Sequence, residues 1–178
     1  MSNIEDKNQQ VAGQGASQNF PKYEKNFGHQ FEENLASALK EKLSEIVEET
    51  ELATSDEDTS RERKTDIWVK FWGIDDPIAL QITFTTSNKR MDEKEEDVLK
   101  NPLVKKEKRT DALIQAPRSC NKVLVSFDKK QVQTGMINEG MLASALRQIM
   151  AGLPNQSKML FIKTAGERMK KAGKKFPT

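Results

Sequence analysis

The chain has 178 residues and a mass of 20.2 kDa, which is enough for one domain with tails. A hydrophobic fraction of 35% can build a single core, and no apolar run approaches the roughly 18 residues of a membrane span. The first residues lack the basic and apolar regions of a secretory signal, so we expect a soluble, cytoplasmic protein with no membrane partner. Cys120 and His29 are the sole residues of their types, which excludes a disulfide framework, a Cys-based zinc site and hydrolases that need several His or Cys.

The net charge of +2 is unevenly distributed along the chain. Residues 1–60 hold 5 Lys and Arg against 13 Asp and Glu, whereas residues 98–178 hold 17 against 5, a net charge of +12. A phosphate backbone attracts such a basic region, although a solvated basic surface would have the same composition. We predict nucleic-acid contacts, with DNA the expected partner, at Lys105, Lys106, Lys108, Arg109, Lys170 and Lys171.

The first half of the chain predicts a tail, a helix and a hairpin. Residues 1–20 are rich in Asn, Gln, Gly and Ser, a composition typical of a disordered tail. From Gly28 to about Glu49, apolar residues recur at three- and four-residue steps and predict an amphipathic helix. Residues 54–64 are polar and predict a loop, and a short strand near 51–55 is left open by the pattern. Alternating residues in 67–71 and 78–84 then predict two antiparallel strands.

The second half predicts two helices and further strands. Helices are expected over residues 89–100 and 139–153, with Pro102 and Pro154 ending them. We expect strands over 122–127 and 159–163, and a short one over 112–116. The resulting order predicts an α/β domain over residues 21–165 with a mixed β-sheet flanked by helices. Residues 166–178 are expected to form a basic tail, with a frayed helix as the alternative.

Polar residues on the hairpin carry the functional signal. Asp66 opens the first strand, and Gln81 and Thr83 lie two apart on the second, so their side chains share one face. Together with Phe31 and Glu32 on the preceding helix, the segments GHQFEENLASAL, KTDIWVKF and PIALQITF resemble the PD-(D/E)XK nuclease superfamily. The resemblance covers residues 28–127 and implies a restriction-endonuclease-like fold, with homodimers common in the family.

The resemblance implies a magnesium site, with two departures from the family pattern. Asp66 matches the first acidic position, whereas Gln81 stands where the family has a second acid and Thr83 where it has a lysine. A Gln carbonyl oxygen can coordinate Mg²⁺ but adds no negative charge, and Thr cannot stabilise a developing phosphorane charge as an ammonium does. The family often adds a helix Glu, so the predicted metal ligands are Asp66, Gln81 and Glu32.

Glu32 also stands out from helical geometry alone. At 100° per residue it lies within about 40° of the centre of the apolar stripe that includes Phe31 and Leu35. A carboxylate there needs a cation, a hydrogen bond or a proton, because bare burial is very costly. The alternative is that Glu32 lies at the edge of the stripe and reaches solvent or an Arg partner.

The missing lysine has candidate replacements elsewhere in the sequence. Lys70 shares a face with Asp66 but lies about 13 Å along the strand, too far to serve one phosphate. Lys89, Arg90 and Lys94, near the start of the next helix, are better placed, and we favour Lys89 because it follows the strand most closely. A solvated helix start is the alternative interpretation.

Three functions stay open at this point. A Mg²⁺-dependent nuclease would use Asp66, Gln81, Thr83, Glu32 and Lys89. A catalytically inactive member of the same fold would bind nucleic acid or a protein partner without cutting. An interaction protein would use its acidic helix and basic end for assembly alone.

Overall fold

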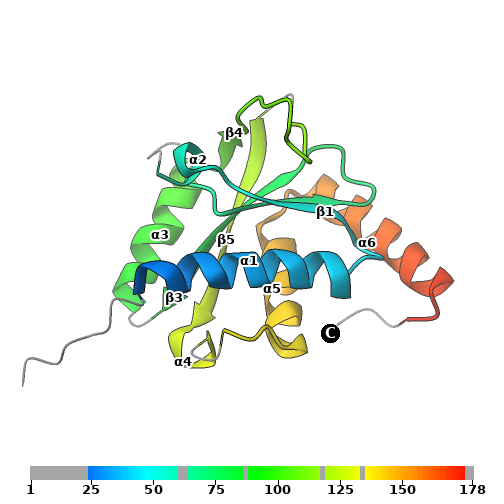
Figure 1. Cartoon of the computed structure of the whole chain (residues 1–178). Coiled ribbons are helices and arrows are strands. Elements are labelled where there is room, and N and C mark those ends of the chain that lie inside the picture. Colours follow the sequence, from blue (N-terminus) through cyan, green and yellow to red (C-terminus); the bar gives the residue numbers. More distant parts are fainter. Residues whose placement is uncertain (1–23, 60–63, 86–87, 117–118, 133–134, 175–178) are drawn as a thin grey trace, which may run out of the picture.

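The computed structural model describes residues 24–59, 64–85, 88–116, 119–132 and 135–174 (Figure 1). The predicted tail over residues 1–20 lies outside these ranges. Within them, no helix combines the length and apolar content that crossing a membrane requires.

The fold is α/β and is built on a mixed five-stranded sheet. Its strands are β1 (Val47–Leu52), β2 (Ile67–Phe71), β3 (Ile78–Thr85), β4 (Leu103–Lys105) and β5 (Ser119–Asp128). The order across the sheet is β1-β2-β3-β5-β4, with β3 and β5 parallel and every other neighbouring pair antiparallel. The parallel pair requires a crossover, which α3 (Asn88–Lys100) supplies.

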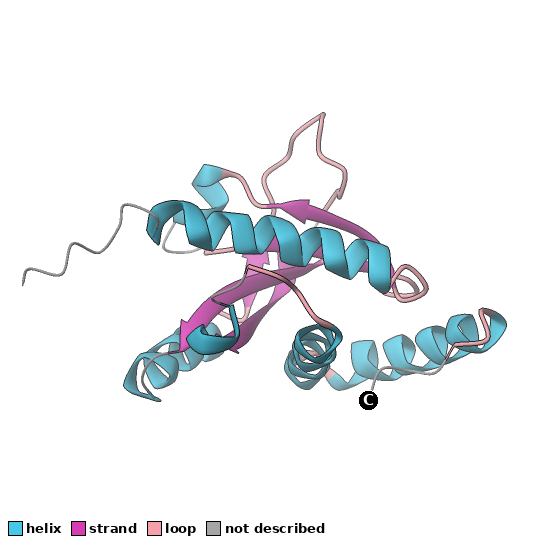
Figure 2. Ribbon diagram, turned by 60° about the horizontal axis from the view of Figure 1, so that its bottom comes forward, coloured by secondary structure: helices cyan, strands magenta, loops and turns pink. Residues whose placement is uncertain are grey.

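Helices cover both faces of the sheet (Figures 1 and 2). One face packs against α1 (Glu24–Lys42), α5 (Glu139–Gly152) and α6 (Asn155–Lys171), whose apolar residues join those of the strands in the main core. The other face holds a smaller cluster around Trp68, and α3 lies on this face. The short helices α2 (Ser55–Thr59) and α4 (Lys129–Val132) complete the described elements.

The main core explains why α1 and the hairpin form. Phe31, Leu35 and Leu39 are at most 1% exposed and follow the helical period, while Ile78, Leu80 and Ile82 follow the period of two expected of a strand. The predicted helices over 89–100 and 139–153 and the predicted strands over 67–71, 78–84 and 122–127 are confirmed within one to three residues at each end.

The first predicted helix was too long. It ends at Lys42, and the N–H groups of Ile46 and Val47 both donate to Leu43 O, which closes a turn. Val47 then starts β1. Ile46 and Val47 are buried, as a helical stripe predicts, but a turn and a strand deliver them to the core. Periodicity could not distinguish these two routes over so few residues.

The end of the chain also differs from its prediction. Residues 159–163 belong to α6, and so do residues 166–171, for which the sequence predicts a tail with a frayed helix as the alternative. Phe161, Ala165 and Met169 are buried at intervals of four, so the helical period extends through Met169. A five-residue apolar run alone does not separate helix from strand.

Three smaller elements were missed, and a further expected strand is absent. Residues 55–59 form α2 inside the predicted loop, residues 103–105 form β4, and residues 129–132 form α4. Residues 112–116, expected as a strand, lie in a described loop between β4 and β5. Ile114 in that loop is nevertheless buried in the smaller core cluster, which accounts for the apolar signal.

Candidate functional site

Asp66 is held beside Gln81 by two hydrogen bonds. Its backbone N–H donates to Leu80 O at 2.9 Å, and its carboxylate Oδ2 accepts the N–H of Ile82. These partners are the two neighbours of Gln81 in β3. The predicted meeting of Asp66 with the polar face of β3 therefore has a geometric basis in the fold.

The carboxyl group of Asp66 favours its protonated form. Burial raises the pKa of Asp66 to about 8, and the hydrogen bond from the Ile82 N–H opposes this rise. The nearby carboxyl groups of Glu32 and Asp58 raise the pKa further, Asp58 through a side-chain hydrogen bond. A cation placed here would relieve both the desolvation and the repulsion among the acids.

Glu32 lies at the edge of the core. Its side chain is 21% exposed, next to the almost fully buried Phe31. Its pKa is raised, first by burial and then by the charge of Asp58, while His29 at 3.7 Å lowers it. The side chain of Glu32 therefore interacts by charge with Asp66 and Asp58 and also reaches solvent.

Gln81 and Thr83 are both buried on the polar face of β3, each 6% exposed. Gln81 Oε1 has no hydrogen-bond partner among the described residues. An amide oxygen that is buried without a partner forgoes about 1–3 kcal/mol, so this atom is suited to receive a ligand. Thr83 Oγ1, in contrast, accepts a hydrogen bond of 2.8 Å from Lys94 Nζ.

Lys94 brings an ammonium group to the polar face of β3. It extends from α3 onto Thr83. The sequence named Lys94 as one of three lysine replacements but favoured Lys89. Lys89 lies in the first turn of α3, and its side chain is outside the described part of the structure.

Two further polar residues near this face were not identified from the sequence. Asp58 was part of a polar segment interpreted as a loop, and its acidic neighbours in the sequence gave no reason to single it out.

Lys122 has a fully buried side chain whose Nζ lies 3.9 Å from Asp97 Oδ2, and neither atom has a hydrogen-bond partner among the described residues. Burial lowers the pKa of Lys122, and Asp97 opposes that shift. The signal available in the sequence was that Lys122 alternates with the apolar residues of β5 and therefore belongs to the polar face of that strand.

The metal-binding capacity of the site rests on oxygen donors. Among the described residues, no three His, Cys, Asp or Glu side chains are close enough to hold a metal ion together. Mg²⁺ is commonly held by one or two carboxylates and completes its shell with water and substrate oxygens. Asp66 with the unpaired oxygen of Gln81 fits that minimal donor set, and Glu32 and Asp58 stand close enough to interact with Asp66 by charge.

The predicted nucleic-acid contacts divide into exposed and buried lysines. Lys105, Lys108, Lys170 and Lys171 are exposed. Lys106 is buried, and its Nζ lies 3.0 Å from Glu51 Oε1, so its ammonium is not available at the surface. Arg109 is 31% exposed and pairs with Glu51 and Asp111.

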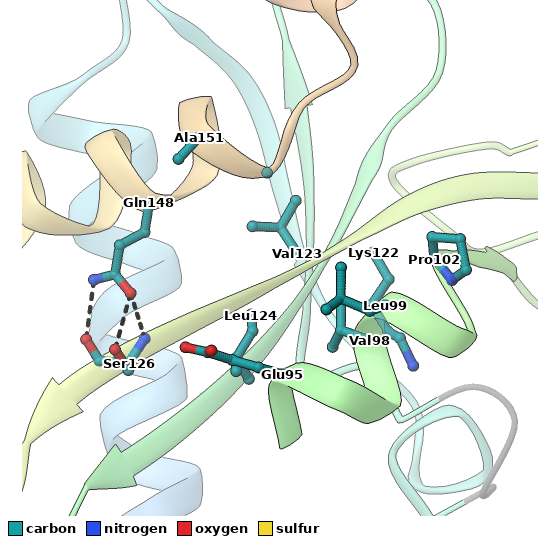
Figure 3. Close-up of a pocket in the computed structure, with 11 residues that line it drawn as sticks. Glu95, Val98, Leu99, Pro102, Lys122, Val123, Leu124, Ser126, Gln148 and Ala151 are labelled. Carbon is teal, nitrogen blue, oxygen red and sulfur yellow. Dashed lines mark hydrogen bonds between the residues drawn. The ribbon is translucent and has the colours of Figure 1, made fainter. Parts of the chain in front are cut away.

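A groove of about 410 Å³ lies between α3 and α5, along the outer edge of β5 (Figure 3). The side-chain amide of Gln148 occupies this edge: its Oε1 accepts the N–H of Ser126 at 2.8 Å and its Nε2 donates to Ser126 O at 3.0 Å. Asp66, Gln81 and Thr83 do not line the groove. The groove is therefore separate from the group formed by Asp66, Glu32 and Asp58, which we call the acidic site.

Comparison with protein-family models, with curated proteins and with solved structures finds no match for this chain.

Proposed function

We propose that this protein is a metal-dependent phosphodiesterase acting on DNA, built on a restriction-endonuclease-like fold with an altered active site. The observation that carries the proposal is that three groups lie along the polar face of β3. They are the Asp66 carboxyl, which accepts the N–H of Ile82, the buried unpaired oxygen of Gln81, and the ammonium of Lys94 on Thr83. The mixed sheet with helices on both faces agrees with the resemblance.

Asp66 and Gln81 would hold Mg²⁺, with Glu32 near enough to add negative charge. Bound there, the ion would supply Lewis-acid polarisation of a phosphodiester and a more acidic water. Lys94 would neutralise the charge that develops on the phosphoryl oxygens during attack. The lysine would thus come from α3 instead of β3, with Thr83 fixing the position of its ammonium.

The neutral Gln81 favours a second candidate function. With no second acid at this position and no group of three metal ligands among the described residues, a protein that binds DNA without cutting it is the alternative. The two candidates differ in a single measurable property, which is metal-dependent cleavage.

The deciding experiment is cleavage of labelled supercoiled, linear and single-stranded DNA, and of RNA, with Mg²⁺ or Mn²⁺. We expect cutting of DNA that requires the metal and is abolished by Asp66→Ala. Lys94→Met should lower the rate about 10²- to 10³-fold, the usual effect of removing one group that stabilises transition-state charge. Lys100→Met is the matched control, because Lys100 lies on the same helix, is exposed and pairs only with Glu96 at 2.6 Å among the described residues.

Salt-sensitive binding without cutting would refute the phosphodiesterase and support the binding protein. Cutting that survives Asp66→Ala would refute Asp66 as a ligand of the metal in the active site. Equal rates for Lys94→Met and Lys100→Met would refute a role for Lys94 in cleavage.

A further inference from the structure

The loop between β4 and β5 is held unusually firmly for a surface segment. We call residues 106–116 the anchored loop; it projects from the edge of the sheet beside α2 (Figures 1 and 2). Glu51 binds it at three points, through Lys106 Nζ at 3.0 Å, the N–H of Ile114 at 2.8 Å and the Arg109 guanidinium at 3.4 Å. Glu57 of α2 accepts the N–H of Glu107 at 2.7 Å.

The loop is also braced from within. Gln115 Nε2 donates to the carbonyl oxygens of Arg109 and Ala112 at 3.1 and 3.2 Å, and the Arg109 guanidinium pairs with Asp111 at 3.1 Å. Both Glu51 and Glu57 are buried, at 8% and 0% exposure. Glu57 also accepts hydrogen bonds from the Thr54 N–H and from Trp68 Nε1, so it ties the loop to α2 and to the sheet. A loop that a rigid scaffold holds in this way is suited to carry function.

The anchored loop presents an apolar side chain to solvent. Leu113 is 70% exposed, although the next residue, Ile114, is 3% exposed and packs in the smaller core cluster. Exposed ammonium groups stand near Leu113 in the sequence, at Lys105 and Lys108, and the exposed carboxylate of Asp111 is paired with Arg109. An exposed apolar side chain with nearby cations is the combination that architectural DNA-binding proteins insert between base steps while the cations hold the phosphates.

Helix α2 connects the anchored loop to the acidic site. Two consecutive residues of α2 interact with different partners: Glu57 binds the anchored loop, and Asp58 interacts with Asp66. A nucleic acid whose phosphate lies at Asp66 would therefore pass the loop. Duplex is favoured over single strands, because the exposed large apolar residues of the described chain are all aliphatic and offer no aromatic stacking platform.

From these observations we infer that the anchored loop docks duplex DNA, with Leu113 wedged between two base pairs and Lys105 and Lys108 on the flanking phosphates. The inference rests on the proposed function for the partner, DNA, but it does not require cleavage. It assigns to this loop the part of the interface that sets where the duplex lies relative to the acidic site.

The test uses full-length protein carrying Asp66→Ala, without divalent metal, so that binding is measured apart from cutting. Affinity for a labelled duplex is read by fluorescence anisotropy at several salt concentrations, and unstacking by the fluorescence of 2-aminopurine placed at successive positions. We expect Leu113→Ala to weaken binding about tenfold and to remove the 2-aminopurine increase. Lys108→Ala should reduce the slope of log affinity against log salt by about 1.

The matched controls are Leu160→Ala, an exposed leucine on α6, and Lys130→Ala, an exposed lysine on α4. Both should leave affinity and 2-aminopurine fluorescence unchanged. Since Leu113 is exposed, its variant should keep the circular dichroism spectrum and melting temperature of the parent protein.

Equal affinity and equal 2-aminopurine signals for Leu113→Ala and its parent would overturn the inference, and so would the absence of duplex binding in the parent. Metal-dependent cleavage by the wild type is scored in separate reactions. Cleavage together with binding that does not depend on the loop would refute DNA docking by the anchored loop and support the phosphodiesterase. Binding that depends on the loop, without cleavage, would support docking by the loop and refute the phosphodiesterase.

Discussion

The buried pair of Glu51 and Lys106 gives the sharpest stability prediction. Lys106 is 1% exposed in its side chain and Glu51 is 8% exposed, and their charged atoms lie 3.0 Å apart. Replacing Glu51 by Gln keeps an oxygen that can accept the N–H of Ile114, so the change mainly isolates the charge of Lys106. An uncompensated buried charge costs about 3–5 kcal/mol.

The lower end of that range is expected for Glu51→Gln. The ammonium of Lys106 also lies 5.6 Å from the centre of the Trp68 ring, a contact that retains about 1 kcal/mol of cation–π stabilisation. We therefore predict a loss of about 3 kcal/mol in the free energy of unfolding. The double variant Glu51→Gln, Lys106→Met should recover most of it, because it removes the isolated buried charge and keeps an acceptor for the N–H of Ile114.

Urea denaturation followed by tryptophan fluorescence measures these values. Glu96→Gln is the control: it breaks an ion pair whose two side chains are more than 60% exposed, and should cost less than about 1 kcal/mol. If Glu51→Gln cost no more than this control, or if the double variant were less stable than the single one, the reasoning on the buried pair would be refuted.

Three further predictions concern Asp66, a turn glycine and the core. Between about pH 4 and pH 8 without metal, folded Asp66 holds a proton that the unfolded chain has lost, so stability should fall as pH rises; urea titrations should show Asp66→Asn removing that slope, and an unchanged slope would contradict the raised pKa. Gly73→Ala should lower the melting temperature, because φ is +79° there and a Cβ would lie 2.3 Å from Thr164 Oγ1, whereas Gly28→Ala, with open space, should not. Phe31→Ala should cost about 3–5 kcal/mol in urea, since its ring packs edge-on against two others at 5.1 Å, and a cost below about 1 kcal/mol would contradict this packing.

The placement of Asp66 next to the polar face of β3 could be predicted because it depends on local rules. Strand alternation fixes which residues share a face, and the short turn after Phe71 forces β3 to pair with β2. Those rules place Gln81 and Thr83 on one face of β3 and place Asp66, at the start of β2, beside Gln81. Glu32 was found in the same way, from the helical period of its neighbours.

Contacts between distant segments could not be predicted in this way. Lys94 reaches Thr83 because α3 lies on the sheet at one particular angle, and a shift of one turn would have delivered Arg90 instead. The sequence identified three candidate basic residues and favoured Lys89 by its closeness to the strand, since helical wheels give direction around an axis and not the position of that axis on a sheet.

The α/β class, the amphipathic helices, the hairpin and the face that carries Asp66 and Gln81 could be predicted from the sequence, because periodicity and turn residues act within a few neighbours. Other features appear only in the folded chain: residues 159–163 are helical, Lys106 turns inward, and Glu51 and Glu57 bind a loop more than 45 residues away. A short apolar run satisfies helix and strand equally. A charged side chain is buried or exposed according to the partner that folding brings to it, and sequence order does not encode that distance.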